Sequence, residues 1–115
     1  MPDELRQWLD ELNSLRTDNI RLKDALSKAV CKDVHSSFVE QAERFQQHFV
    51  EKDQIMDILR QDINKLMVRI TTGKITDADL HQHTSLKKDM QQLSEAFRNM
   101  KMAFAKFLAS EKMHD

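Results

Sequence analysis

The chain has a single glycine, Gly73, and a single proline, Pro2, in 115 residues. Sheets with their tight turns require many such residues, so this chain is predicted to be all-α. Gly73 lies in a short break, Thr71-Thr72-Gly73-Lys74-Ile75, between two long helical patterns. Because a glycine that follows a helix commonly takes a left-handed backbone conformation, we expect a positive φ at Gly73 and a reversal of the chain there.

Apolar residues recur at alternating steps of three and four on both sides of this break, over about residues 38–71 and about 77–112. A short connection between two long helices predicts an antiparallel helical hairpin. If the two arms pair evenly from the break, Phe45 faces Phe104 across the hairpin.

The start of the second arm is marked by a helix-capping pattern. Thr76 is followed three residues later by Asp79, which predicts a capping box. Ile75 and Leu80 are placed to form a hydrophobic staple across the same turn, and Leu80 is also the first residue of the predicted apolar stripe.

An N-terminal helix is predicted over about residues 3–31, with Pro2 in its first turn. Its apolar residues follow a heptad, which is typical of a coiled-coil seam. Asn19 interrupts this seam, and two interpretations remain open: it pairs with its equivalent in a dimer, or it faces water at the edge of an intramolecular bundle. The predicted interface residues of the seam are Trp8, Leu12, Leu15, Asn19, Leu22 and Leu26.

The periodicity lapses between residues 31 and 37, where poorer helix formers collect. Ser37 with Glu40 matches a second capping box, which predicts a break or kink near His35–Ser37. An apolar stripe that continues at four-residue steps through Val34 favours a continuous helix instead. We expect the break.

These elements predict a single helical domain over residues 1–115, made of a coiled-coil-like helix (1–35) and a helical hairpin (36–115). The three helices are expected to form either a three-helix bundle or a dimeric helical bundle or coiled coil. Because a long, thin rod buries little surface, we expect a homo-oligomer, most simply a dimer.

The histidines and the single cysteine are the candidates for ligand chemistry. His81 and His83 are two residues apart and point in different directions on a helix, so His83 is predicted to be a half-buried structural histidine. Cys31 and His35 are four residues apart and would share a helical face, which makes them the best metal or haem candidates. Two ligands are too few for a site, so no metal and no cofactor are predicted.

The sequence contains no nucleophile motif and no glycine-rich phosphate loop, so we do not expect an enzyme. Its charges are spread evenly along the chain, which argues against nucleic acid as a partner. No apolar stretch is long enough for a membrane span or a signal peptide, and the lone cysteine fits a reducing compartment, so a cytoplasmic location is expected.

The leading functional hypothesis is a non-enzymatic module for self-association or protein–protein interaction, which dimerises through its heptad seams or binds a helical protein partner. One alternative is a sensory helical bundle that binds a metal, haem or apolar ligand. A weaker alternative is binding to a membrane surface through Lys and Arg side chains beside the phenylalanines of the last helix.

Overall fold

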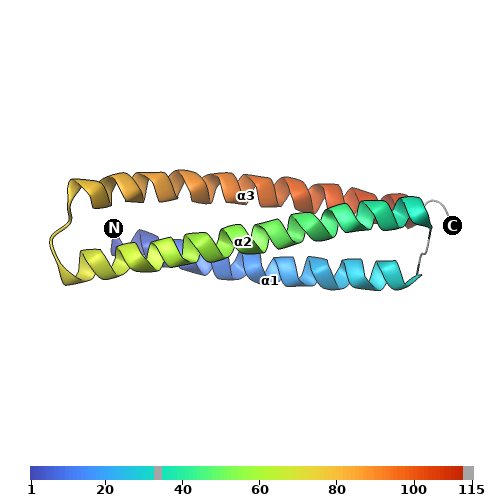
Figure 1. Ribbon diagram of the computed structural model, residues 1–115, viewed down its shortest axis with the longest axis horizontal. Coiled ribbons are helices and arrows are strands. Elements are labelled where there is room, and N and C mark those ends of the chain that lie inside the picture. Colours follow the sequence, from blue (N-terminus) through green and yellow to red (C-terminus); the bar gives the residue numbers. More distant parts are fainter. Residues whose placement is uncertain (33–34, 113–115) are drawn as a thin grey trace.

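The computed structural model describes residues 1–32 and 35–112 and folds almost entirely into three α-helices. Helix α1 spans Pro2–Lys32, α2 spans Ser36–Thr72 and α3 spans Asp77–Lys112. The helices run up, down and up, so that α1 and α3 point in the same direction and α2 is antiparallel to both (Figure 1).

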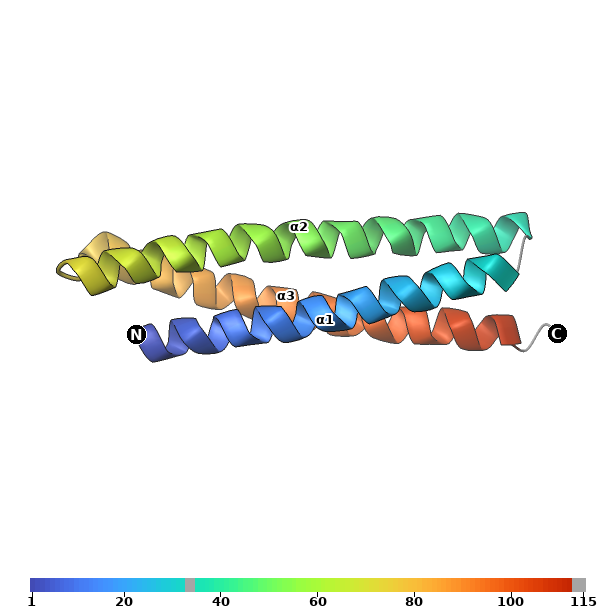
Figure 2. The same cartoon turned by 90° about the horizontal axis from the view of Figure 1, so that it is seen from below.

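Together the helices form a rod with extents of 61 × 19 × 18 Å. A view from below shows α1 lying along the hairpin of α2 and α3 over most of its length (Figure 2). The predicted all-α class, the hairpin and the N-terminal helix are therefore confirmed, and the helices close into a three-helix bundle within one chain.

One continuous apolar core runs along this rod, and all three helices contribute to it. The side chains come from successive turns of each helix, which is the stripe that a 3.6-residue period places on one face. The buried apolar residues are Leu5, Trp8, Leu12, Leu26, Phe38, Ala42, Phe49, Met56, Leu59, Ile63, Leu66, Leu86, Met90, Leu93, Phe97, Met100, Phe104 and Phe107.

The predicted register of the hairpin is confirmed where aromatic rings meet. The ring of Phe45 lies 5.3 Å from that of Phe104, edge to face, and 5.1 Å from that of Phe107. Phe49 packs edge to face on Phe104 at 5.2 Å, and Phe38 stacks on Phe107 at 4.9 Å. These contacts fix α2 against α3 at the end of the rod opposite the hairpin turn.

The predicted capping box at the start of α3 is also confirmed. The backbone N–H of Asp79 donates to Thr76 Oγ1 at 3.2 Å, and the backbone N–H of Thr76 donates to Asp79 Oδ2 at 3.1 Å. The Asp79 carboxylate also accepts a hydrogen bond from Arg69 Nε at 3.1 Å, which links the last turn of α2 to the first turn of α3. The hydrogen bond from the Thr76 backbone lowers the pKa of Asp79, and those from Arg69 and the Thr76 side chain lower it further, so the pKa lies below its ordinary value although burial opposes the change.

Two expectations about the hairpin turn are wrong. Gly73 has φ −154° and ψ −168°, an extended conformation that any residue can adopt, so the chain does not reverse through a left-handed glycine. Leu80 is 48% exposed and lies outside the core, because the turn of α3 that holds it lies beyond the N-terminus of α1 and has only α2 beside it (Figure 1). The staple with Ile75, which is also exposed, stays a prediction.

At the other end of the rod, the break between α1 and α2 is confirmed, but the cap predicted at Ser37 is wrong. Helix α2 begins at Ser36, and His35, with φ −65° and ψ 136°, holds the N-cap position. The backbone N–H of Val39 already donates to the carbonyl of His35 at 2.9 Å, so Ser37 lies inside the first turn. Val34, on which the continuous-helix alternative rested, lies outside the described residues.

Candidate functional site

The predicted interface residues of α1 lie inside the bundle. Trp8, Leu12, Asn19 and Leu26 are buried, and two further seam residues are partly buried against the same core. The heptad seam is therefore covered by helices of its own chain. Contact of this seam with a second molecule stays a prediction, and it would require the bundle to open.

Asn19 does not face water, and its amide nitrogen is hydrogen-bonded within the chain, whereas Oδ1 is buried and has no hydrogen-bond partner among the described residues. Its side chain is 0% exposed, and Nδ2 donates to the carbonyl of Phe49 at 3.0 Å and to Asp53 Oδ1 at 2.8 Å. Lys23 binds the other oxygen of the Asp53 carboxylate. Burial raises the pKa of Asp53, but the hydrogen bonds from Lys23 and Asn19 outweigh it and leave the pKa below its ordinary value.

His83 lies near the N-terminus of α3, and its side chain contacts residues near the N-terminus of α1. Its ring stacks on that of Trp8 at 5.0 Å, and Nε2 lies 2.7 Å from Glu4 Oε1, a separation at which a protonated histidine forms an ion pair. The His83 side chain is 19% exposed, as expected for a half-buried structural histidine. Its neighbour His81 is exposed.

The two metal candidates are not on one helical face. Cys31 is exposed in the last turn of α1, and His35 is exposed at the N-cap of α2, because α1 ends at Lys32. Within residues 1–32 and 35–112, no three His, Cys, Asp or Glu side chains are grouped so that they could hold a metal ion.

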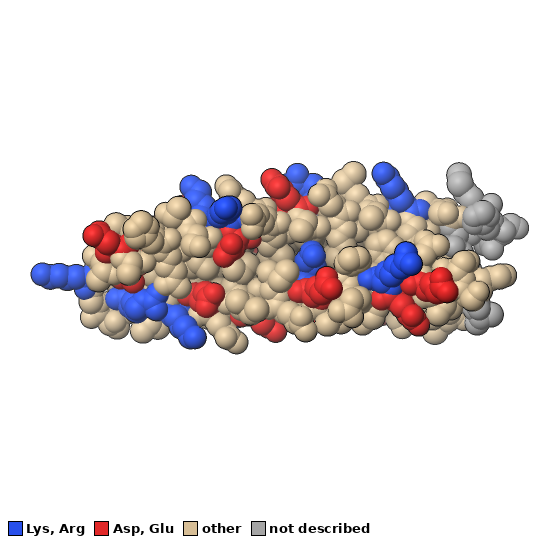
Figure 3. Space-filling model, turned by 45° about the horizontal axis from the view of Figure 1, so that its top comes forward, with Lys and Arg blue, Asp and Glu red and all other residues tan. Residues whose placement is uncertain are grey.

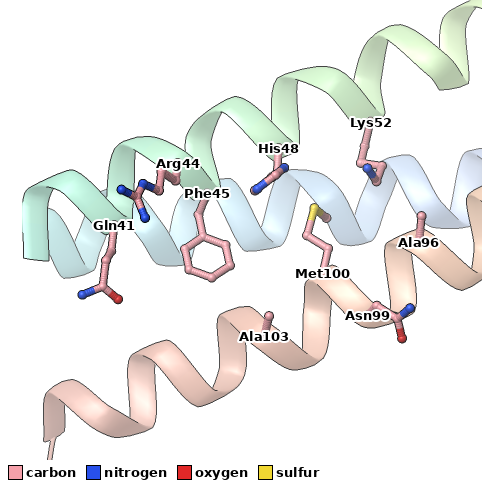
Figure 4. A pocket seen from close by; sticks show the side chains of 9 residues that line it. All are labelled: Gln41, Arg44, Phe45, His48, Lys52, Ala96, Asn99, Met100 and Ala103. Atoms are coloured by element: carbon pink, nitrogen blue, oxygen red, sulfur yellow. The ribbon is translucent and has the colours of Figure 1, made fainter.

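The surface feature that none of these predictions identified is a groove between α2 and α3. Two adjacent hollows, of about 460 and 340 Å³, share Lys52 and Ala96 in their linings, and we call them together the α2–α3 groove. Helix α1 lies behind the part of the groove shown in Figure 4. The groove is lined by Gln41, Arg44, Phe45, His48, Lys52, Ile55, Ile58 and Leu59 of α2 and by Asp89, Gln92, Leu93, Ala96, Asn99, Met100 and Ala103 of α3.

The groove has an apolar floor. Phe45 and Met100 point into the gap between the two helices in Figure 4, and Leu59 and Leu93 line the gap further along. The α2 wall also carries two large apolar side chains that the bundle leaves uncovered.

These two side chains are Ile55, 40% exposed, and Ile58, 59% exposed. On the α3 wall, Ala96 and Ala103 are seven residues apart and therefore lie on the same side of the helix. Their small side chains make the α3 wall low there. An exposed apolar groove between two helices, with one low wall, has the shape that accepts a further helix.

Charge along the groove is uneven. Arg44, His48 and Lys52 follow one another at four-residue spacing on α2, whereas the facing part of α3 contributes Ala96 and Asn99, which are uncharged. His48 Nδ1 lies 3.6 Å from Glu51.

Arg44 and Lys52 form no ion pair with any residue that the structure describes. The acidic residue in the lining, Asp89, lies toward the hairpin turn. Figure 3 shows Lys, Arg, Asp and Glu side chains of both signs distributed along the face of the rod that it displays.

The comparisons with known proteins give no assignment: no protein-family model, no curated protein and no solved structure matches this chain. Within the part of the chain that the structure describes, none of the helices is long and apolar enough to cross a membrane. The phenylalanines of α3, on which membrane-surface binding was hypothesised, are buried in the core.

Proposed function

We propose that this protein is a non-enzymatic interaction module: a three-helix scaffold that binds a further α-helix in its α2–α3 groove. The observation that supports the proposal is the pair of exposed isoleucines, Ile55 and Ile58, beside an apolar floor that the chain's own helices leave uncovered. A docked helix would convert three helices into four, which is a common way for helices to complete a core.

Burial of apolar surface would contribute to the binding of a docked helix. Covering the exposed parts of Ile55 and Ile58 would contribute about 1 kcal/mol each from the area removed from water. Large exposed apolar side chains that line a groove mark interaction surfaces more often than isolated ones do. The proposed binding surface is therefore the α2–α3 groove, on the side of the hairpin opposite α1, and not the heptad seam of α1 that the sequence predicted.

The docked helix could belong to a second copy of the chain. The sequence also predicts a homodimer, but this one would form through the groove and not through the heptad seam of α1. A helical protein partner is the other source of the docked helix. Light scattering separates the two, because the purified chain has a mass of 13.6 kDa as a monomer and twice that as a dimer.

Two isoleucines of matched exposure test the use of the groove. Ile58 in the groove is 59% exposed, and Ile20 on α1, outside the groove, is 58% exposed. A helix-forming peptide with a leucine seam and uncharged glutamine flanks is titrated against the wild-type chain, Ile58→Glu and Ile20→Glu, with fluorescence anisotropy of the labelled peptide as the readout.

We expect Ile58→Glu to weaken peptide binding by about tenfold, which corresponds to about 1.4 kcal/mol, and Ile20→Glu to leave binding within about twofold. Equal losses in the two variants would show that the peptide binds elsewhere on the surface. Absence of binding to the wild-type chain would contradict the proposed function itself.

A further inference from the structure

We infer that the partner of the α2–α3 groove is an amphipathic helix whose flank is acidic where it passes Arg44 and Lys52. This inference rests on the proposed function and adds the chemistry and the orientation of the bound helix. It is carried by the combination of an apolar floor with two cations that the bundle does not neutralise.

The cations are placed to contact a bound helix without entering its apolar seam. Arg44 is exposed and Lys52 is half-buried, and both line the groove from the α2 wall. Since they are eight residues apart, they lie on the same side of α2, about two turns from each other. Carboxylates two turns apart on one flank of the partner would pair with both.

The facing wall does not supply these carboxylates. At the level of Arg44 and Lys52, α3 presents Ala96, Asn99 and Ala103, which carry no charge. Glu51 lies against His48, and Glu40, one turn before Arg44, forms no ion pair with it among the described residues. An acidic partner flank would therefore meet two cations that form no ion pair with the residues that the structure describes.

The position of Asp89 adds a direction. Asp89 lines the other end of the groove, beside Ile55 and Ile58, so the charge of the lining changes from positive to negative toward the hairpin turn. A partner helix with acidic residues at one end and a basic residue at the other would bind in one orientation. The groove follows α2 from Gln41 to Leu59, roughly 27 Å at 1.5 Å per residue, which suits a helix of about 18 residues.

A second copy of this chain fits the groove less well. If two copies packed groove to groove, each would offer the two cations of the other a single lining carboxylate, Asp89, which lies at the far end of the groove, so at least one cation would stay unpaired. Charge complementarity thus favours a different helical protein with an acidic flank.

The test uses three labelled peptides of about 18 residues that share one leucine seam and differ only in their flanks, which carry Glu, Gln or Lys. Their affinities are measured for the full chain, for Arg44→Glu/Lys52→Glu, and for the control Lys74→Glu/Lys88→Glu, which changes the net charge equally outside the groove lining. Circular dichroism of each variant verifies that the helices remain.

We expect the Glu-flanked peptide to bind the wild-type chain about tenfold more tightly than the Lys-flanked peptide, with the Gln-flanked peptide between them. The order should reverse in Arg44→Glu/Lys52→Glu and persist in the control variant. The preference should shrink in 1 M salt, where the screening length is about 3 Å.

Equal affinities for the three peptides would overturn the inference and leave the helix-binding function standing. An order that persists in Arg44→Glu/Lys52→Glu would overturn it as well, because the charge would then be recognised elsewhere. A dimer whose groove excludes all three peptides would identify a second copy as the occupant and refute the acidic partner. Failure of every peptide to bind a monomeric chain would instead reject the proposed function.

Discussion

Asn19 Nδ2 donates a hydrogen bond to Asp53 Oδ1 at 2.8 Å, which joins the middle of α1 to α2 of the same chain. A polar residue in a heptad seam commonly sets the register between helices, and here the register that it sets is intramolecular. A one-turn slip of α1 along α2 would leave the buried amide without these partners. The network therefore favours one alignment of the two helices.

Replacing Asn19 by alanine is predicted to destabilise the bundle. The variant loses two hydrogen bonds to α2 and leaves the Asp53 carboxylate with fewer donors, so the free energy of unfolding should fall by about 1–3 kcal/mol in urea titrations. Asn13→Ala is the control, because the Asn13 side chain lies on the exposed surface, where its Oδ1 accepts a hydrogen bond from Arg60. Losses of equal size in the two variants would contradict a special role for the buried network.

The two capping sites provide a second prediction. Thr76→Ala removes a hydroxyl that accepts a hydrogen bond from the backbone of Asp79, and it should lower the free energy of unfolding by about 0.5–2 kcal/mol. Ser37→Ala changes a residue inside the first turn of α2 and should stay within about 0.5 kcal/mol of the wild-type chain. If Ser37→Ala proved as costly as Thr76→Ala, α2 would begin later in solution than it does in this structure. Thermal unfolding followed by circular dichroism measures both.

The hairpin turn should tolerate the loss of its glycine. At Gly73 the backbone is extended, and an added Cβ would lie 3.7 Å from the carbonyl oxygen of Arg69, an ordinary contact distance. Gly73→Ala should therefore stabilise the chain by about 0.4–1 kcal/mol, because it reduces the freedom of the unfolded chain. A loss of stability of similar size would indicate that the glycine takes a positive φ in solution.

Acid is predicted to weaken the bundle through Asp53 and Asp79. Both carboxyl groups have a pKa below the ordinary value in the folded chain, so the unfolded chain binds more protons as the solution becomes acidic. Their stabilising effect is complete above the unfolded pKa of about 4 and is lost as the pH falls through the folded values. Urea midpoints at pH 7 and at pH 3 measure this loss. Asp53→Asn should reduce the difference between the two midpoints, and an unchanged difference would exclude a contribution from Asp53.

Much of the fold was predictable because its signals are local. The helical periods, the break near His35 and the Thr76–Asp79 capping box each depend on residues within a few positions of one another. The Ser37–Glu40 pattern is equally local but was misleading. Several adjacent residues can cap that helix, and the pattern does not determine which of them takes the non-helical backbone.

The groove was not predictable in the same way. Heptad spacing identifies the faces that meet, but it does not determine on which side of the hairpin α1 packs, and that choice decides which apolar flank stays open. Ile55 and Ile58 lie beside the main stripe of α2 and gave no signal of their own. Lys52 was the available clue. It stands three residues after Phe49 and four before Met56, on the apolar stripe of α2, so its ammonium group required a route to water, and the groove provides that route.

The claim that the α2–α3 groove binds a helix is tested most directly by mapping the bound peptide on the protein. Two-dimensional ¹H–¹⁵N spectra of the full chain are recorded while the Glu-flanked peptide is added to saturation. We predict that the amide signals of Ile58, Ala96 and Ala103 shift, while those of Ile20 and Val68, which are exposed outside the groove lining, stay in place. Shifts confined to α1, or no shifts at saturating peptide, would contradict the account.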